Sequence, residues 1–597
     1  MEKNMSTLYE EMQSIERSYF ATEVYPYAPQ IYKSYKITDS LNRVFDGVSD
    51  AMVYDMTWGS GFNIKLCSRL NTENKRKVVG SLKDHKKIRY ILKPFHQSIS
   101  RCKTAQNIKM LLVCIVIPII AKMFHLEVLD INKELEKNEN LSGNWYDGLF
   151  DVTCIGKWIR EYETASEDLL FDLGMKVFGG YFYCRDLKNA GIWADKCEEI
   201  STKQKQKKEI NCIKNQINSA LCRAKKDVLG KKHILVNWVD ALRYDELSEM
   251  PFLEKTMKEG LFFDKMYAPT LYTNPELRSL LLGKLQIDDT SWKIKEEDIK
   301  KSSFYKSADK KGYKVAISSY KWSSVLADER CVNQSERGSS YISFITLCLM
   351  QELEKTIVLS HIGIYEVHNP HISPWITKGG VIEDYYGKEK YEWAKKQSKI
   401  SKEYLDEQIE YWYEMMQPGL RNTIWLSDHG EDRGEDSFGI EGYHHTVFSI
   451  TGEGINAERA QKVASLLRFK DAIHSLLNNE SENLKDIMQA DYSLIQNEDI
   501  YGTLFRYKKT NVDQRLQYRG VVTNEDTFVR VVNGNEYYFR GEEINLINDN
   551  RWQKRIEELR GITGNTFVDI YKHDRYRKTR KLYRKYRIKR SKKNKFI

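Results

Sequence analysis

The sequence predicts an α/β fold in which helices flank a central, mostly parallel sheet. Two apolar runs, 233–239 and 423–427, have the length and composition of strands that are buried on both faces. Polar side chains follow each run directly: Asp240 after the first, and Asp428 with His429 after the second. Helical patterns alternate with such runs in the same half of the chain, which is the order that a parallel sheet requires.

The elements of this region are predicted in chain order. We expect strands at 234–239, 313–318, 356–363 and directly before Asp428, and helices at about 247–259, about 275–282 and 401–416. Pro275 suits the first turn of its helix, because the proline ring fixes φ near the helical value. From about residue 515 the pattern changes to strand pairs. The segment 519–540 alternates around Asn533-Gly534, a strong hairpin signal that predicts a small C-terminal antiparallel sheet.

Composition divides the chain into five parts. We predict a helix-rich N-terminal region (1–200), a charged surface helix as connector ending at Gly230 (201–232), the α/β core (233–510), a C-terminal subdomain with the hairpin (511–571) and a basic tail (572–597). Within the first part, 158–173 is expected to be helical. The apolar run 110–121 has only 12 residues, whereas a spanning helix needs ~20, so it is expected to be a buried core element. A hairpin that dips into a membrane is the alternative.

Charge is distributed unevenly along the chain. The segment 572–597 holds 14 Lys or Arg residues and one acid, a net of +13, whereas the whole chain is +10. The remainder is therefore close to neutral, at −3. Such a tail is either a solvated, disordered end or an electrostatic anchor for an anionic lipid surface, a polyanionic glycan or nucleic acid.

Cysteine usage and the N-terminus indicate the compartment. Ten cysteines are scattered without a CxxC pair, and the first 20 residues contain no apolar signal core. Both features favour a reducing compartment. We therefore expect a cytoplasmic protein, with attachment to a membrane surface through the tail as an extension of that prediction.

Four residues far apart in the chain have the chemistry of one metal site. Asp240, Asp428 and His429 are expected at the carboxyl ends of strands, where ligands bind in open α/β sheets. Two carboxylates and an imidazole can hold a divalent cation. A hydroxyl beside that cation, here Thr273, would be an activated nucleophile. Thr273 is also a candidate N-cap for the helix that follows it, and the two roles are compatible, because the helix N-terminus would face an anionic phosphate.

Three segments also carry a family resemblance. They are NWVDALRYDEL around Asp240, YAPTLYTNPELRSLLLGK around Thr273, and WLSDHGEDRGED followed by GYHHTVFSITG around Asp428. In this order and spacing they resemble the sulfatase-like branch of the alkaline phosphatase superfamily, over roughly residues 230–560. The resemblance implies an alkaline-phosphatase-like central sheet. It also implies one or two divalent ions, Zn or Mn in the first place and Ca or Mg as alternatives.

Thr273 distinguishes this chain from true sulfatases. Those enzymes carry at this position a Cys that becomes formylglycine, a conversion that is open to Cys and in some systems Ser, but not to Thr. Leu277 also stands where the family has an Arg, and Arg278 follows it. Thr at this position resembles the phosphodiesterase and phosphotransferase members, in which a metal-bound threonine alkoxide attacks phosphorus and a phospho-threonine forms.

Ligands of a second metal are sought in SHIGIYEVHNPH. The resemblance implies His368, in the HNP triplet, as the first choice and His361 as the next, whereas His371 is expected at the surface. The Asp-x-x-x-His pair of two-metal family members is missing from this region.

Further residues are expected around the first metal. His444, or else His445, matches the family's late histidine, because only one of two adjacent side chains on an extended segment can face the site. Glu431 is expected to orient His429. Arg243 is expected to pair with acids near the site.

These features together predict a metal-dependent phosphoester hydrolase or phosphotransferase of the sulfatase-like type. Thr273 would be its nucleophile and a phosphoester, glycan- or lipid-linked, its substrate. Two alternatives stay open. One is a catalytically silent sulfatase-like scaffold or binding module, and the other is a nucleic-acid-directed phosphodiesterase that uses the tail 572–597.

Overall fold

The fold is described from a computed structural model of the chain. It describes residues 7–20, 149–285, 296–319, 338–368, 371, 373–375, 388–431, 438, 440–497, 517–541, 545–564 and 567. The predicted core element at 110–121 and the basic tail at 572–597 lie outside these residues. Within them, no helix combines the length and the apolar character that a membrane crossing demands.

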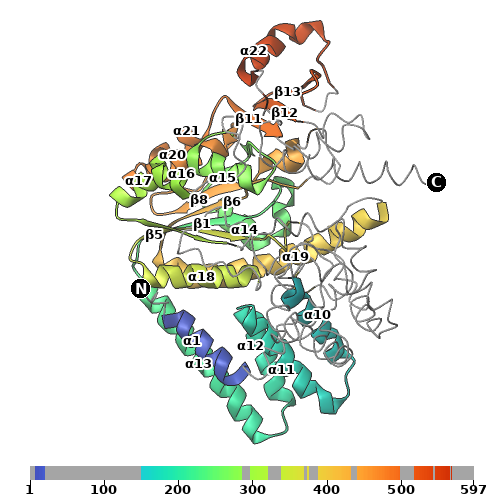
Figure 1. Cartoon of the computed structure of the whole chain (residues 1–597), viewed down its shortest axis with the longest axis vertical. Helices are drawn as coiled ribbons and strands as arrows, with labels where there is room; N and C mark the ends of the chain where they lie inside the picture. The colour runs from blue at the N-terminus through green and yellow to red at the C-terminus, as the bar shows by residue number, and fades with distance from the viewer. Residues whose placement is uncertain are drawn as a thin grey trace, which may run out of the picture.

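A sheet forms the centre of the molecule (Figure 1). It has seven strands in the order β4-β5-β1-β6-β8-β2-β9. Its strands are β1 (His233–Val239), β2 (Leu261–Phe263), β4 (Lys314–Ser318), β5 (Thr356–Ile362), β6 (Leu420–Leu426), β8 (Phe448–Gly452) and β9 (Glu458–Ala460). The first four strands in that order run parallel. β8 is antiparallel to β6 and β2, and β9 is parallel to β2. The predicted α/β class with a mostly parallel central sheet is confirmed.

The middle strands are buried on both faces, as the apolar runs predicted. Every residue of β1 and β5 is buried. Along β1, Ile234, Val236 and Trp238 contribute to one hydrophobic cluster, whereas Leu235 and Val239 pack on the other side, because successive side chains point to opposite faces. Each such buried side chain contributes about 1.5–3 kcal/mol relative to exposure.

Helices cover both faces of this sheet (Figure 1). One face is covered by α14 (Pro251–Lys258), α18 (Ser339–Glu352) and α19 (Lys388–Met416). The opposite face is covered by α15 (Thr273–Leu282), α16 (Glu296–Lys301), α17 (Ser303–Lys310), α20 (Phe469–Asn478) and α21 (Leu484–Met488). The helix predicted at 247–259 is divided into the 3-10 helix η3 (Tyr244–Glu249) and α14, because a proline disfavours helical backbone in the residue before it.

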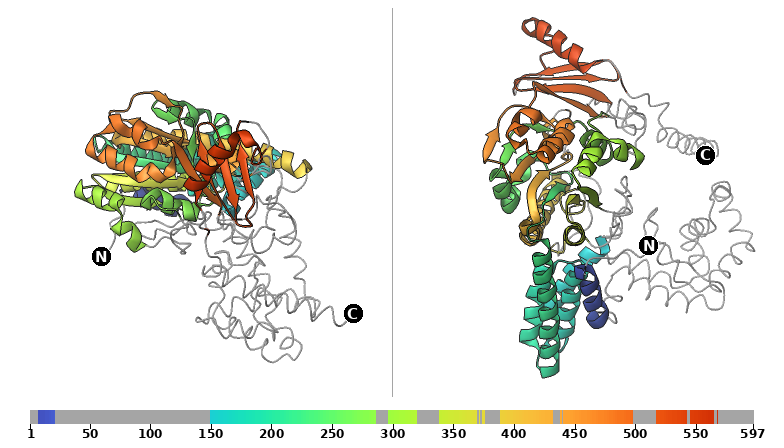
Figure 2. Two further views of the ribbon diagram at one scale, coloured as in Figure 1. Left: turned by 90° about the horizontal axis from the view of Figure 1, so that it is seen from above. Right: turned by 90° about the vertical axis from the view of Figure 1, so that its left-hand side faces the viewer.

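A layer of helices extends from the sheet on the α18 side (Figures 1 and 2). It contains α1 (Thr7–Ile15), the π-helix η1 (Glu16–Phe20), α10 (Leu149–Glu163), α11 (Glu167–Tyr183), α12 (Leu187–Ile200) and α13 (Gln204–Val228). The helix predicted at 158–173 is broken between α10 and α11. The connector helix corresponds to α13, but it is more than a surface link, because an apolar face from Ile210 to Val228 is buried in the same hydrophobic cluster as α18.

A second sheet lies at the opposite end of the molecule (Figure 2). It has the antiparallel order β11-β12-β13-β14, and α22 packs on it. These elements are β11 (Tyr492–Asn497), β12 (Tyr518–Thr523), β13 (Thr527–Val531), β14 (Glu536–Phe539) and α22 (Gln553–Thr563). The predicted hairpin is the β13–β14 turn, where Gly534 has φ 93°, a value that favours glycine. β11 precedes residue 511, so the small sheet begins earlier in the chain than the predicted C-terminal subdomain.

Short strands connect the two sheets. They are β3 (Met266–Tyr267), β7 (His445–Thr446) and β10 (Ala464–Ser465), in the order β10-β3-β7. The segments that follow β3 and precede β7 border the carboxyl end of the central sheet, where the candidate site lies.

Candidate metal centre

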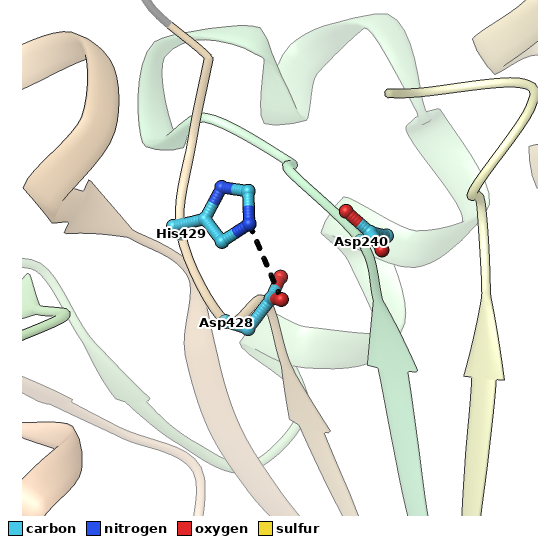
Figure 3. A group of neighbouring side chains, drawn as sticks. All are labelled: Asp240, Asp428 and His429. Atoms are coloured by element: carbon cyan, nitrogen blue, oxygen red, sulfur yellow. Dashed lines mark ion pairs between the residues drawn. The ribbon is translucent and has the colours of Figure 1, made fainter. Parts of the chain in front are cut away.

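The carboxyl ends of β1 and β6 bring three polar side chains together. These strands are parallel neighbours, with Trp238 opposite Leu426, so Asp240 and the Asp428-His429 pair leave the sheet side by side (Figure 3). One ligand atom from each of the three lies within 4.8 Å of the others, and all three residues are buried. Within the described part of the chain, this is the group of His, Cys, Asp or Glu residues that could hold a metal ion.

Backbone contacts fix the loop that carries Asp428. The N–H of Ala241 donates to Asp428 Oδ1 at 3.2 Å, which joins the two strand ends. The N–H of Gly430 donates to the carbonyl oxygen of Tyr443 at 2.8 Å. A Cβ at position 430 would stand 1.9 Å from the carbonyl oxygen of Gly442. The Asp-His-Gly turn therefore needs its glycine for this close approach.

Each of the two carboxylates has one oxygen that is available to a cation. Asp240 Oδ2 accepts a hydrogen bond from His361 Nε2 at 2.8 Å. Asp240 Oδ1 and Asp428 Oδ2 are buried and have no hydrogen-bond partner among the described residues. Burial raises the pKa of Asp240, whereas the hydrogen bond from His361 lowers it, and the net result is a pKa below its ordinary value. Two unpaired oxygens of this kind are costly unless a cation neutralises them.

The imidazole of His429 presents a lone pair to the same space. Its Nδ1 lies 2.7 Å from the carbonyl oxygen of Gly430, which only accepts, so Nδ1 carries the hydrogen of the neutral ring. Nε2 is then an acceptor, 3.4 Å from Asp428 Oδ2. Two electron-rich atoms at this distance repel each other, and a divalent ion between them removes the repulsion. The donor set of two carboxylates and one imidazole therefore fits such an ion.

Thr273 lies beside this cluster. Its hydroxyl is 3.2 Å from His429 Nε2, to which it donates. Because Nε2 is 3.4 Å from Asp428 Oδ2, the hydroxyl lies within the ~8 Å of that carboxylate that a shared site allows. Thr273 is the first residue of α15, and Tyr272 holds the N-cap position. The prediction that Thr273 is the helix N-cap is therefore wrong.

A buried acid in α15 holds the loop that leads to Thr273. Glu276 Oε2 accepts from the N–H of Thr270 at 3.0 Å and from its hydroxyl at 2.8 Å. Leu277, the next residue, is buried in the core under α15. The contact between Glu276 and Thr270 was not predicted from the sequence. The string Thr273-x-x-Glu276 has the spacing of a capping box, but Glu276 contacts Thr270, six residues ahead of it, so no local pattern predicts this pair.

The two histidines proposed for a second metal differ in position. His361, in β5, contacts Asp240 through Nε2 and has its Nδ1 3.0 Å from Ser319 Oγ. His368 is half-buried, and its ring centroid lies 6.4 Å from that of His429. Both therefore border the site, but neither is among the three residues whose ligand atoms converge.

His444 and His445 are not brought into the cluster. His444 lies with Nδ1 2.7 Å from the carbonyl oxygen of Ala268 and Nε2 2.9 Å from the hydroxyl of Tyr518, and burial lowers its pKa to about 4. His445 lies with Nδ1 2.6 Å from the carboxylate of Glu441 and Nε2 2.8 Å from a backbone carbonyl oxygen. The rings face different surroundings, as expected of adjacent residues, and both nitrogens of each ring are occupied there.

Arg243 and Glu431 connect the loops around the site. Arg243 binds the carboxylate of Asp245 through two nitrogens, at 2.8 and 2.7 Å, and donates to the carbonyl oxygen of Glu431 at 3.2 Å. The Glu431 carboxylate lies 3.2 Å from His371 Nε2. His429 Nδ1 uses Gly430 instead, so the prediction that Glu431 orients His429 is wrong.

The expectation that His371 lies at the surface is also wrong. Its side chain is buried. Its carbonyl oxygen accepts from Gln397 Nε2 at 2.8 Å and from Ser401 Oγ at 2.9 Å, both in α19. Its φ of 55° is unusual for a residue other than glycine. These contacts come from a distant helix, so the local sequence carried no signal for them.

Fold and site together define an α/β protein with a candidate metal centre at the carboxyl edge of its main sheet. No family model matches the sequence, and no curated protein does. Solved structures match over about half of this chain or slightly more.

Three of these structures illustrate the range. A phosphonate monoester hydrolase from Silicibacter pomeroyi is 12% identical, with a TM-score of 0.44, and the match covers 57% of this chain and 97% of that one. A 2-O GAG sulfatase is 11% identical, with a TM-score of 0.42 and coverage of 56% and 91%. A protein of the alkaline phosphatase superfamily from Vibrio parahaemolyticus is 12% identical, with a TM-score of 0.35 and coverage of 52% and 79%.

Proposed function

We propose that this chain is a metal-dependent phosphoester hydrolase or phosphotransferase of the sulfatase-like type, with Thr273 as its nucleophile. The observation that carries the proposal is the convergence of three acceptor atoms on one buried point beside a hydroxyl. We assign them to Asp240 Oδ1 and Asp428 Oδ2, the carboxylate oxygens without a hydrogen-bond partner among the described residues, and to His429 Nε2, which lies 3.2 Å from the Thr273 hydroxyl.

The three acceptor residues would hold one divalent cation, Zn²⁺ or Mn²⁺ before Ca²⁺ or Mg²⁺. When bound, the cation supplies a Lewis acid that lowers the pKa of a nearby hydroxyl and neutralises charge on a phosphoryl group. Asp240 and Asp428 would contribute the negative charge that retains it, and His429 a neutral imidazole nitrogen.

Thr273 would then perform the covalent step. Its hydroxyl oxygen attacks phosphorus, the P–O bond to the leaving alcohol breaks, and the hydroxyl proton departs with that alcohol. Water completes hydrolysis by attacking the phospho-threonine, and an acceptor hydroxyl would complete transfer instead. Because Thr273 begins α15, the backbone N–H groups of the first helical turn are near the attacked phosphate and favour its negative charge.

A phosphoester is favoured over a sulfate ester by the side chain at position 273. True sulfatases need formylglycine to cleave sulfate esters, and formylglycine does not form from Thr. The Thr273 hydroxyl can attack phosphorus without such a modification. We therefore expect phosphodiesters or phosphomonoesters to be turned over far faster than aryl sulfates.

The test combines metal analysis with a substrate screen. Purified protein is analysed for Zn and Mn and assayed with nitrophenyl phosphate, bis-nitrophenyl phosphate and nitrophenyl sulfate, as wild type and Thr273→Ala. Thr164→Ala, at an exposed threonine in the helical layer, is the matched control. Metal-dependent phosphoester turnover that Thr273→Ala alone removes supports the proposal. Bound metal without turnover of any ester would favour the scaffold alternative, and efficient sulfate cleavage would contradict the proposed chemistry.

A further inference from the structure

His361 is joined on both sides to the end of a neighbouring strand. Its Nε2 lies 2.8 Å from Asp240 Oδ2, at the end of β1, and its Nδ1 lies 3.0 Å from Ser319 Oγ, after β4. β5, which carries His361, lies between β1 and β4 in the sheet. All three residues are buried. The result is a hydrogen-bonded row that crosses three strands and ends at a candidate metal ligand.

The direction of each hydrogen bond follows from chemistry. A carboxylate accepts only, so the proton of the neutral His361 ring is on Nε2, which donates to Asp240. Nδ1 is then an acceptor, and the hydroxyl of Ser319 donates to it. The carboxylate of Asp240 thus selects the ring tautomer, and Ser319, whose hydroxyl can donate or accept, adds a second anchor to the ring at Nδ1.

Packing prevents the His361 ring from leaving this orientation. His361 and Trp238 are register partners in the β5–β1 pair. Their rings stack with centroids 3.7 Å apart and planes inclined by 11°. The strand pairing continues to the end of β1, because the N–H of Asp240 donates to the carbonyl oxygen of Ile362 at 2.9 Å. Backbone and ring together hold the carboxylate at a fixed place.

We propose that His361 is a positioning residue for Asp240 and not a metal ligand, with Ser319 anchoring the other side of its ring. By holding Oδ2, His361 leaves Oδ1 of Asp240 as the oxygen directed at the cation, and that atom has no hydrogen-bond partner among the described residues. This inference rests on the proposed metal site. It assigns both nitrogens of His361 to protein partners, so neither serves a second metal ion.

The experiment measures metal affinity, independently of turnover. Chelator-stripped protein is titrated with Zn²⁺ and Mn²⁺ by calorimetry, as wild type, His361→Leu, His361→Gln and Ser319→Ala. Loss of such an outer partner lowers metal affinity roughly 10- to 100-fold, which is the expected result for His361→Leu. His361→Gln should stay within about threefold of wild type, because its side-chain N–H₂ can replace Nε2. Ser319→Ala should fall between the two.

A second Ser–His pair in the chain provides the control. Ser307 Oγ lies 2.8 Å from His474 Nδ1, on α17 and α20, away from the site. His474→Leu and Ser307→Ala should bind metal with wild-type affinity. If they also lose affinity, the effect reports general loosening of the fold, and the positioning role is overturned.

The remaining outcomes separate this inference from the proposed function. Wild-type protein that binds no metal would refute both. Metal binding by His361→Leu at wild-type affinity would refute the positioning role and leave the metal site standing. Equal losses in His361→Gln and His361→Leu would show that the ring acts as a ligand, against the proposal. If His361→Leu does not fold, Ser319→Ala provides the test. A lower metal affinity in folded Ser319→Ala supports the positioning role of His361, and an unchanged affinity overturns it.

Discussion

The hydroxyl of Thr273 lies 3.2 Å from Nε2 of His429, although 156 residues separate them in the chain. Thr273 comes from the first turn of α15, on one face of the sheet, and His429 from the turn after β6. Their contact places a nucleophilic group at the edge of the candidate cation site.

Thr273→Ala should reduce phosphoester turnover by at least about 10³-fold, because it removes the attacking oxygen. Thr273→Ser should retain measurable activity, since it keeps a hydroxyl at the same position. Steady-state kinetics and metal content of the three proteins check this. Unchanged turnover in Thr273→Ala would place the chemistry elsewhere.

Asp428→Asn should separate metal binding from stability. Without metal, the variant should be at least as stable as wild type, because Asp428 Oδ2 and Asp240 Oδ1 are buried acceptors without hydrogen-bond partners among the described residues. Metal at 100 times its Kd should stabilise wild type by about 2.7 kcal/mol and the variant far less. Thermal unfolding with and without Zn²⁺ measures both effects. Asp309→Asn, at an exposed acid, is the control, and an equal metal effect in Asp428→Asn would argue against its ligand role.

Glu276→Gln should impair catalysis while metal binding persists. The carboxylate accepts both hydrogen bonds from Thr270, at 3.0 and 2.8 Å, and thereby holds the loop before Thr273. Replacing it by an amide weakens these contacts, at a cost of about 1–3 kcal/mol in stability. We expect a lower kcat and an unaltered metal stoichiometry. Glu259→Gln, at an exposed position, should change neither quantity. Normal kcat in Glu276→Gln would show that the loop does not depend on this acid.

Asp186 should make the stability of the helical layer depend on pH. Burial raises its pKa to about 7, against the hydrogen bonds from Asn189 and Tyr404. The folded state therefore keeps a proton that the unfolded state has lost, and the free energy of unfolding should fall as the pH rises from about 4 to about 7. The change is on the order of a few kcal/mol.

Asp186→Asn should flatten this dependence, because Asn also caps the start of α12 but carries no charge. Urea unfolding at a series of pH values measures the slope. Asp172→Asn, at an exposed acid of α11, should keep the wild-type slope. The same slope in Asp186→Asn and wild type would remove Asp186 as the cause.

Deleting residues 572–597 should leave turnover of small substrates unchanged and weaken binding to anionic surfaces. The reason is the separation of charge, +13 in this segment against −3 in the rest. Each Lys or Arg near an anionic membrane contributes about 1 kcal/mol, and salt screens the attraction. Co-sedimentation with phosphatidylserine vesicles over a salt series, with full-length and truncated protein, measures the effect. Equal binding by both proteins would identify the segment as a solvated end.

Much of the sheet could be predicted because its signals are local. The runs before Asp240 and Asp428 are apolar throughout, and strands with that composition occur where helices cover both faces. The predictions were less accurate where one residue changes the local geometry. Pro251 divides one expected helix, and the turn between α10 and α11 breaks another.

The sequence by itself determined which side chains reach the carboxyl edge of the sheet, because a residue that directly follows a buried strand must emerge there. Tertiary structure alone decided what each side chain contacts. His361 meets Asp240 through the register of β5 against β1, and the carbonyl oxygen of His371 is held by side chains of α19. His444 lies between Ala268 and Tyr518, away from the cluster. These partners come from segments that are remote in the chain, and strand order and loop packing bring them together. A local pattern of residues therefore cannot predict them.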